Sequence, residues 1–124
     1  MINMKTLTNL IDPTDSGWQL VQDWISTATN AYQILPCTPA SAEQNLLYLQ
    51  ITTQSPMGAI AHHTGGILID SGWIRILGSG GEVISRSLKS WNTSQKAEGF
   101  LLIADDVVGG YFALNGGAVN HYPV

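Results

Sequence analysis

Charged side chains are scarce in this sequence of 124 residues, where Asp, Glu, Lys and Arg together make up 11%. An average soluble domain carries roughly 25% charged residues, whereas hydrophobic residues reach 44% here. Intrinsically disordered chains have the opposite composition, so this one is incompatible with extensive disorder. The length accommodates one hydrophobic core of modest size, and we therefore expect a single domain over residues 1–124.

Cysteine is represented by Cys37 alone, which excludes an intrachain disulfide and is compatible with a reducing cytosol. No apolar run approaches the ~20 residues that a membrane-spanning helix needs. Residues 1–13 contain a single lysine and no small-residue cleavage site, unlike a signal peptide. Together these absences predict a cytoplasmic protein that has no membrane partner.

Lysine and arginine are absent from Thr6 to Ile74, a stretch that nevertheless contains five acidic residues: Asp12, Asp15, Asp23, Glu43 and Asp70. Basic residues gather instead between Arg75 and Lys96, and the formal net charge is −4. Phosphate binding needs a basic surface, so this balance argues against nucleic acid as a partner. An acidic face would instead attract a basic protein.

Catalytic and metal-binding signatures are also missing. The chain has no H-E-x-x-H, C-x-x-C, G-x-S-x-G or phosphate-loop motif. His62 and His63 are neighbours in a predicted strand, which would direct them to opposite faces and keep them from sharing one metal ion. We therefore assign no catalytic residue, no metal site and no cofactor from the sequence.

Glycine, by contrast, is abundant: twelve of the thirteen glycines lie between Ser55 and Gly117, among short apolar runs. This texture is typical of strands joined by tight turns. It predicts strands over residues 59–62, 67–70, 73–77, 100–104 and 111–114, with Ser71-Gly72 as a hairpin turn and Ser87 to Trp91 as a short helical turn. The run at 100–104 is almost entirely apolar, which favours a central strand that is covered on both faces.

The first half of the chain has helical spacing. A capping box at Ser16 and Gln19 is expected to open one helix, and Thr38 with Pro39 a second. Residues 34–37 are expected to form the break between them. Helices that are followed by strands with short turns predict an α+β fold, in which N-terminal helices pack on a mostly antiparallel sheet. The helical part covers about residues 14–54 and the strand-rich part about 57–122.

The residues from Tyr111 to Tyr122 include a candidate site for self-association. A short edge strand from Ala118 to Tyr122 can follow the turn at Asn115-Gly116-Gly117. If that strand does not form, the strand at Tyr111 to Leu114 is an exposed edge, which pairs readily with another chain. We therefore consider a homo-oligomer formed through the C-terminal edge strand.

Asp105 and Asp106 follow the central apolar run and have two interpretations. A carboxylate there can act in acid–base chemistry, or it can cap the turn at 107–110 by accepting backbone amides, which we favour. Gly78–Gly81 can form an anion-binding nest near Arg75, but a flexible loop is the interpretation that we favour, because the phosphate-loop motif is absent. Trp73 is a candidate anchor of an interface.

Several collinear blocks carry a family resemblance: WQLVQDWI at 18–25, LQITTQSPMGAIAHHTGGILIDSGWIRILGSG at 49–80, SRSLKSWN at 85–92 and GFLLIADDVVGGYFALNGG at 99–117. They resemble a bacterial family known as domain of unknown function 2625. Members of that family continue past the NGG turn, so the resemblance implies that this chain is shortened at its C-terminus. The segment FLLIADDVVGGYFALN after an N-terminal helix is also distantly similar to the SUKH superfamily, which implies a SUKH-like fold.

SUKH proteins are often immunity proteins that neutralise bacterial toxins, and the acidic balance suits a basic toxin as partner. We therefore expect a non-enzymatic protein-binding module, with an immunity protein as its more specific form and with Trp73, Arg75, Asp105 and Asp106 as partner-binding residues. The alternative is a small-ligand-binding protein or an enzyme that uses Asp105, Asp106 and the Gly78–Gly81 loop.

Overall fold

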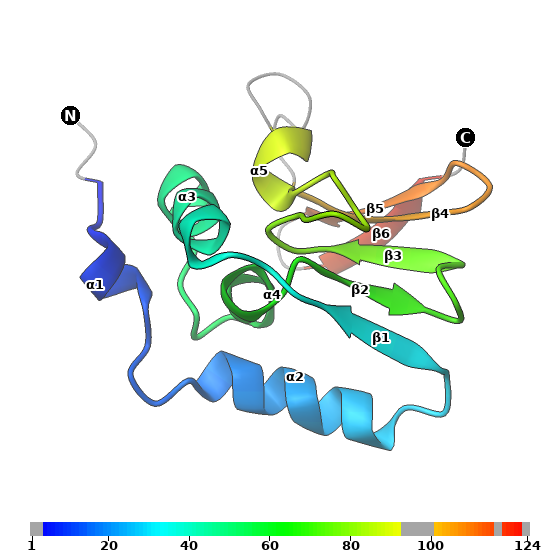
Figure 1. The fold of residues 1–124 in the computed structure, drawn as a ribbon, viewed down its shortest axis with the longest axis horizontal. Helices are drawn as coiled ribbons and strands as arrows, with labels where there is room; N and C mark the ends of the chain where they lie inside the picture. Colours follow the sequence, from blue (N-terminus) through cyan, green and yellow to red (C-terminus); the bar gives the residue numbers. More distant parts are fainter. Residues whose placement is uncertain (1–3, 93–100, 116–117, 123–124) are drawn as a thin grey trace.

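The protein has an α+β structure, drawn in Figure 1. It is a computed structural model that describes residues 4–92, 101–115 and 118–122. The described residues form five helices and one six-stranded sheet. The elements are α1 (Leu7–Leu10), α2 (Ser16–Thr27), β1 (Tyr32–Leu35), α3 (Pro39–Leu49), α4 (Pro56–His63), β2 (Gly66–Ile69), β3 (Ile74–Leu77), α5 (Leu88–Trp91), β4 (Leu101–Asp106), β5 (Tyr111–Asn115) and β6 (Ala118–Tyr122).

The strands lie in the sheet in the order in which they occur in the chain, β1-β2-β3-β4-β5-β6, and every neighbouring pair is antiparallel. The predicted fold class is therefore confirmed. The apolar run expected at 100–104 becomes β4, an interior strand whose residues from Leu102 to Asp106 are all buried. A register shift between Leu102 and Ala104 marks a bulge in its pairing with β5.

The edge strand expected at 118–122 is present as β6, which pairs with β5 along its length. Tyr111–Leu114 is therefore an interior strand and is not the exposed edge that the sequence left open. Of the described strands, β6 forms one margin of the sheet and β1 the other.

Helix α4 corrects the prediction of a strand at 59–62. Ser55 is its N-cap, accepting a hydrogen bond from the amide of Gly58 at 3.0 Å, and Pro56 occupies the first turn. These are ordinary start signals for a helix. The short apolar run after them fits a buried helix as well as a strand, and the packing of α4 against α2 and α3 selects the helix.

The break predicted at 34–37 is also wrong at its first two residues, because Ile34 and Leu35 belong to β1. This strand of four residues pairs with β2, placing Ile34 opposite Ile67 and Leu35 opposite Gly66. A strand of four residues is too short to show a recognisable alternation of apolar and polar residues. Its partner strand β2 also lies about thirty residues further along the chain.

Helix α2 begins at Ser16, but not through the expected capping box. Its N-cap is Asp15, which has a positive φ of 57° and makes no capping hydrogen bond with its side chain. The carboxylate of Asp12 instead accepts hydrogen bonds from the backbone amide and the hydroxyl of Ser16, and the side-chain amide of Gln19 donates to the carbonyl of Thr14. The predicted start of α3 is confirmed, since Thr38 accepts from the amide of Ser41 ahead of Pro39.

The hairpin between β2 and β3 turns at Asp70, Ser71 and Gly72, with φ values of 51°, 60° and 95°. Three successive positive φ angles reverse the chain sharply, which agrees with the predicted turn at Ser71-Gly72. The short helical turn expected at 87–91 is α5, where Ser87 and Ser90 form a reciprocal capping box.

Two clusters of buried side chains form the core. The larger lies among α1, α3, α4, α5 and the sheet, and includes Leu10, Leu46, Leu77 and Leu88. The smaller joins α2 and α4 to the sheet through Val21, Ala59, Ile60 and Ile67. Helix α2 packs mainly on α4, and it reaches the sheet through the side chains of this smaller cluster.

Candidate functional site

Arg75 and Asp105, two of the residues predicted to bind a partner, face each other across β3 and β4 as register partners. Arg75 donates from Nε to Oδ1 of Asp105 at 2.9 Å and from Nη2 to Oδ2 at 3.0 Å. Its Nη2 also donates to the carbonyl of Asp106 at 3.0 Å. This two-point geometry is the strong form of an arginine–carboxylate pair.

Arg86 approaches the same carboxylate from the loop before α5. Its Nη2 lies 3.2 Å from Oδ1 and 3.0 Å from Oδ2 of Asp105, and its guanidinium sits 5.3 Å from the centre of the Trp91 ring. Asp105 thus accepts four hydrogen bonds from two arginines while only 8% of its surface is exposed. Both oxygens of this carboxylate are occupied by hydrogen bonds within the protein, so the arrangement favours a structural role over acid–base chemistry.

Asp106 has the turn-capping role that the sequence predicted for this pair of residues. Its Oδ1 accepts the amides of Val108 at 3.2 Å and Gly110 at 2.9 Å, and its own amide donates to the carbonyl of Gly110. The carboxylate therefore stabilises the turn between β4 and β5 from within.

Trp73 lies at the tip of the β2–β3 hairpin and is 56% exposed. Its carbonyl accepts a hydrogen bond from the amide of Val107, which holds this hairpin beside the β4–β5 turn. Val107 and Val108 are exposed there as well. We call Trp73, Val107 and Val108 the hairpin-tip patch. Asp105 and Asp106 lie beneath it, in the strand end that leads into its valines.

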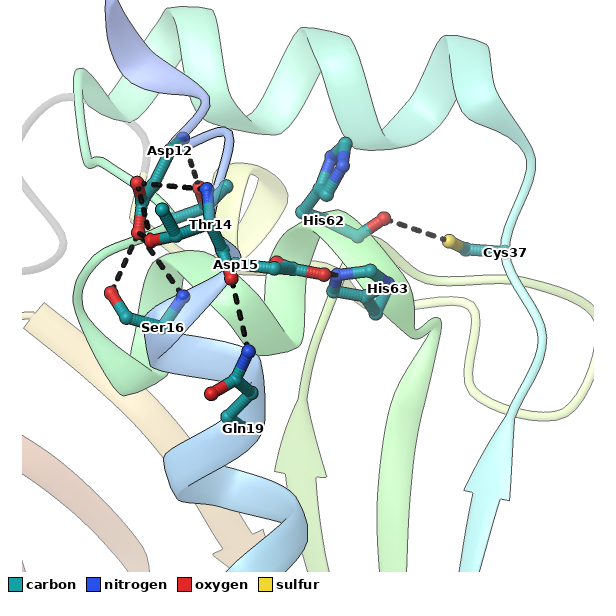
Figure 2. Close-up of polar contacts among 9 residues, drawn as sticks. Asp12, Thr14, Asp15, Ser16, Gln19, Cys37, His62 and His63 are labelled. Carbon is teal, nitrogen blue, oxygen red and sulfur yellow. Dashed lines mark hydrogen bonds and ion pairs between the residues drawn. The ribbon is translucent and has the colours of Figure 1, made fainter.

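The structure also forms a histidine cluster that the sequence did not predict, shown in Figure 2. His63 at the end of α4 pairs through Nε2 with the carboxylate of Asp15, at 2.8 and 2.9 Å from its two oxygens. The ring of Trp18 stacks on His63 at 4.5 Å, and the ring of His62 meets it edge-on at 4.8 Å. The carboxylate of Asp70 accepts a hydrogen bond from the side-chain amide of Asn30, and the side chain of His121 lies outside the described residues.

This cluster lacks an activated nucleophile. Partial burial, followed by the neighbouring His63, lowers the pKa of His62 below its ordinary 6.5, so the ring favours its neutral form. Burial raises the pKa of the Cys37 thiol, which donates weakly to the carbonyl of His62 at 3.8 Å. A protonated thiol is a weak nucleophile. Among the residues that the structure describes, no group of three or more His, Cys, Asp or Glu side chains forms a metal site.

Next to this cluster, Asp12 anchors the loop before α2. Hydrogen bonds from Ser16, followed by those from Thr14, lower the pKa of Asp12 to about 2. The carboxylate is fully engaged within its own loop, as the dashed lines in Figure 2 show, and it therefore orders the start of α2.

The glycine-rich loop borders a hollow of about 280 Å³, whose walls include Cys37, Thr38, Gly65, Gly80 and Glu82. The loop does not form the anion-binding nest considered above, because its amides are already engaged. Ser79, Gly80 and Gly81 donate to the carbonyls of Thr64, Gly65 and Ile84. The buried hydroxyl of Ser79 donates to the carbonyl of Ala61, and neither Asp105 nor Asp106 lines this hollow.

A larger groove of about 710 Å³ lies between α2, α4 and one face of the sheet. Its lining is almost entirely apolar: Val21, Trp24, Ile25 and Ala28 from α2, Pro56, Met57 and Ile60 from α4, and Ile67, Ile69, Ile76, Leu101, Ile103 and Leu114 from the strands, with Ile51 and Ser55 beside them. Trp24 is 55% exposed at this groove.

Comparison with known proteins assigns the family. The family described as "Protein of unknown function DUF2625" matches residues 7–123. The chain belongs to this family. It is 45% identical over 124 residues to an uncharacterized protein of Haemophilus influenzae, and 45% identical over 116 residues to the putative uncharacterized protein YbfG of Escherichia coli.

These matches cover 95% and 92% of this DUF2625 chain, but only 54% of each relative. The chain therefore spans about half the length of the curated relatives it matches. No solved structure matches it. No described helix is both long and apolar enough to span a membrane.

Proposed function

We propose that this DUF2625 chain is a protein-binding module that acts through the hairpin-tip patch and performs no catalysis. The observation that carries the proposal is the exposure of Trp73, Val107 and Val108 on two turns that are joined by the hydrogen bond from the amide of Val107 to the carbonyl of Trp73. Tryptophan is enriched among the residues that dominate binding energy. Preorganised turns also avoid the entropy that a flexible loop loses on binding.

In this proposal the other three predicted site residues act as positioning residues. Arg75 and Asp105 join β3 to β4 directly beneath the patch, and Asp106 shapes the turn that presents its valines. Their burial and their mutual hydrogen bonds suit support of the contact surface. Trp73 supplies the direct contact.

The acidic charge of the N-terminal half favours a basic protein as the partner. Arg75 and Arg86 are both engaged with Asp105, so they offset little of the acidity of the N-terminal half. Residues 6–74 contain five acidic side chains and no lysine or arginine. One of them, Asp70, is exposed in the same turn as Trp73. An acidic surface beside an apolar anchor favours a basic protein, both in orientation and in association rate.

The finer form of the proposal is an immunity protein that neutralises a basic toxin in the cytoplasm. It depends on the distant similarity of 100–115 to SUKH proteins together with this charge balance, and a fold by itself does not determine function.

The test uses two matched variants, Val108→Asp in the patch and Val83→Asp in the loop before α5. The two valines are 66% and 65% exposed. Each tagged protein is used to capture partners from cells that express it, with quantification by mass spectrometry. We expect Val108→Asp to reduce recovery of the partner at least tenfold and Val83→Asp to leave it unchanged. Equal recovery with both variants would refute the proposal.

The immunity form has its own measurement. The captured partner is expressed alone and then together with this chain, and bacterial growth is followed. A toxic partner whose effect is relieved by the wild-type chain, and not by Val108→Asp, would support this form. A partner that does not impair growth would be consistent with a protein-binding module but would exclude the immunity role.

The alternative of a small-ligand-binding protein or an enzyme has one observation in its favour, the 280 Å³ hollow against Gly80 and Gly81. It would have to work without Asp105 and Asp106, which do not line that hollow. Amide NMR shifts of Gly80 and Gly81 during titration with small carboxylates and phosphates test it. Saturable shifts confined to these residues would favour a ligand-binding function at this hollow over the protein-binding function.

Self-association remains a separate proposal, now at the outer side of β6, since β5 is already paired on both sides. An edge strand presents unpaired backbone groups to another chain. Sedimentation over a hundredfold concentration range tests it, with a concentration-independent monomer as the contrary result.

A further inference from the structure

The apolar groove between α2, α4 and the sheet is a large surface that the proposed function does not use. It lies apart from the hairpin-tip patch, because none of Trp73, Val107 and Val108 lines it. At about 710 Å³, the groove is far larger than a packing defect between neighbouring side chains. Apolar surface of this extent is stabilised only when something covers it.

The lining indicates what kind of occupant fits. Small-molecule sites combine apolar walls with a few polar groups that orient the ligand. Among the described residues that line the groove, only Ser55 has a side-chain hydroxyl, and this hydroxyl already donates to the carbonyl of Thr52 and accepts from the amide of Gly58. The described lining therefore offers a polar ligand head little beyond the indole N–H of Trp24, whereas the apolar face of a polypeptide needs no polar partner.

A second copy of this chain is a poor occupant on geometric grounds. A two-fold symmetric contact places the same patch of each copy against the other. The groove is a hollow, so such a contact would place hollow against hollow and leave both unfilled. The occupant must be a convex apolar element with a different shape.

The lengths of the relatives supply such an element. At 45% identity they share this fold, yet this chain spans only 54% of each of them. We propose that the groove is the docking surface for the polypeptide that makes up the remaining part of the longer DUF2625 proteins. An apolar helix or strand of that part would pack between α2 and the sheet and complete the smaller core cluster around Val21, Ile60 and Ile67.

Trp24 provides a reporter for this contact, because it lines the groove and is 55% exposed. Tyr48 on α3 is 46% exposed and does not line the groove, which makes it a matched control. Trp24→Cys and Tyr48→Cys are each introduced together with Cys37→Ser, so that each protein has one thiol. Circular dichroism first verifies that both variants retain the fold.

The probe is the part of the E. coli relative that has no counterpart in this chain, used in two forms. In one form it is added as a separate polypeptide, and in the other it is joined to this chain by a long flexible linker. The rate of maleimide labelling is then measured. We expect labelling of the Trp24→Cys protein to slow at least tenfold in either form, while labelling of the Tyr48→Cys protein stays within twofold.

Three results would overturn the proposal. Unchanged labelling at position 24 in both forms would show that the added polypeptide does not cover the groove. Protection that grows with the concentration of this chain alone would identify a second copy as the occupant. Protection by laurate or palmitate, and not by the polypeptide, would identify an apolar small molecule. None of these readouts involves Val108, so failure here is distinguishable from failure of the proposed function.

Discussion

The guanidinium of Arg75 and the carboxylate of Asp105 form a two-point ion pair across β3 and β4, with N···O distances of 2.9 and 3.0 Å. The two residues are also register partners in the sheet, so the strand pairing and the ion pair support each other. Arg86 adds a second cation from outside the sheet. Asp105 therefore joins three segments that are far apart in the sequence.

Replacing Asp105 should lower the stability of the fold. Asp105→Asn leaves two half-buried guanidinium groups without their counter-charge, and we expect the free energy of unfolding to fall by about 2–3 kcal/mol. Urea denaturation measures it, and Asp23→Asn on the exposed face of α2 serves as a control that removes the same charge. A loss below ~0.5 kcal/mol, similar to that of a surface substitution, would contradict the structural role.

Gly58 permits the close approach of α4 to the preceding loop. A Cβ atom at this position would lie 1.8 Å from the carbonyl oxygen of Thr52, which is backbone and cannot move aside cheaply. We expect Gly58→Ala to destabilise the fold by about 3 kcal/mol. Gly72→Ala is the control for backbone strain without a steric clash. A Cβ atom at Gly72 would have no neighbour within 4 Å, but its φ of 95° is unfavourable for alanine. The cost of this control substitution should be only about 1–2 kcal/mol, and equal costs would argue against the close contact.

Ser55 is the start signal of α4, and its removal tests the correction from strand to helix. Ser55→Ala leaves the amide of Gly58 without its acceptor, so the free energy of unfolding should fall by about 1 kcal/mol. Ser55→Asp preserves a capping oxygen and should restore most of this loss. Thermal unfolding of the two variants measures the difference, and identical melting temperatures would be contrary to the capping role.

The histidine cluster predicts a loss of stability in mild acid. The folded state lowers the pKa of His62 below 6.5, so the unfolded chain takes up this proton first. The contribution of His62 is therefore fully present above pH 6.5 and is lost as the pH falls through the lower, folded pKa. Urea midpoints between pH 8 and pH 5 measure it, and His62→Gln should remove this part of the pH dependence.

The same cluster offers a direct check by NMR. His63 contributes to the lowered pKa of His62, while Asp15 acts in the opposite direction and is paired with His63. In His63→Gln the pKa of His62 should therefore move up towards 6.5. An unchanged titration curve of the His62 ring protons would leave burial as the whole cause.

Much of the local structure was predictable because its signals lie within a few residues. Thr38 and Pro39 marked the start of α3, Ser71-Gly72 marked the β2–β3 turn, and the carboxylate of Asp106 suited the turn after β4. These features depend on capping hydrogen bonds and positive φ angles, which a short segment determines by its own chemistry.

The errors lie where local signals were ambiguous. The apolar run Ala59–His62 by itself fits a buried helix or a buried strand, and the start signal at Ser55 and Pro56 together with packing against α2 and α3 makes it helical. β1 is a strand because β2 pairs with it. His63 meets Asp15 only because this segment is helical. The histidine cluster was therefore missed when the segment was predicted to be a strand.

The sequence by itself determined the α+β class, the acidic N-terminal half and the turn chemistry, because composition and short-range hydrogen bonding are properties of neighbouring residues. The tertiary structure decided which charges pair and which apolar faces remain open. Asp105 between two arginines and Trp24 at an open groove both depend on segments that meet only when the sheet and helices pack. Such meetings depend on loop closure and core packing over many tens of residues, and no local pattern encodes them.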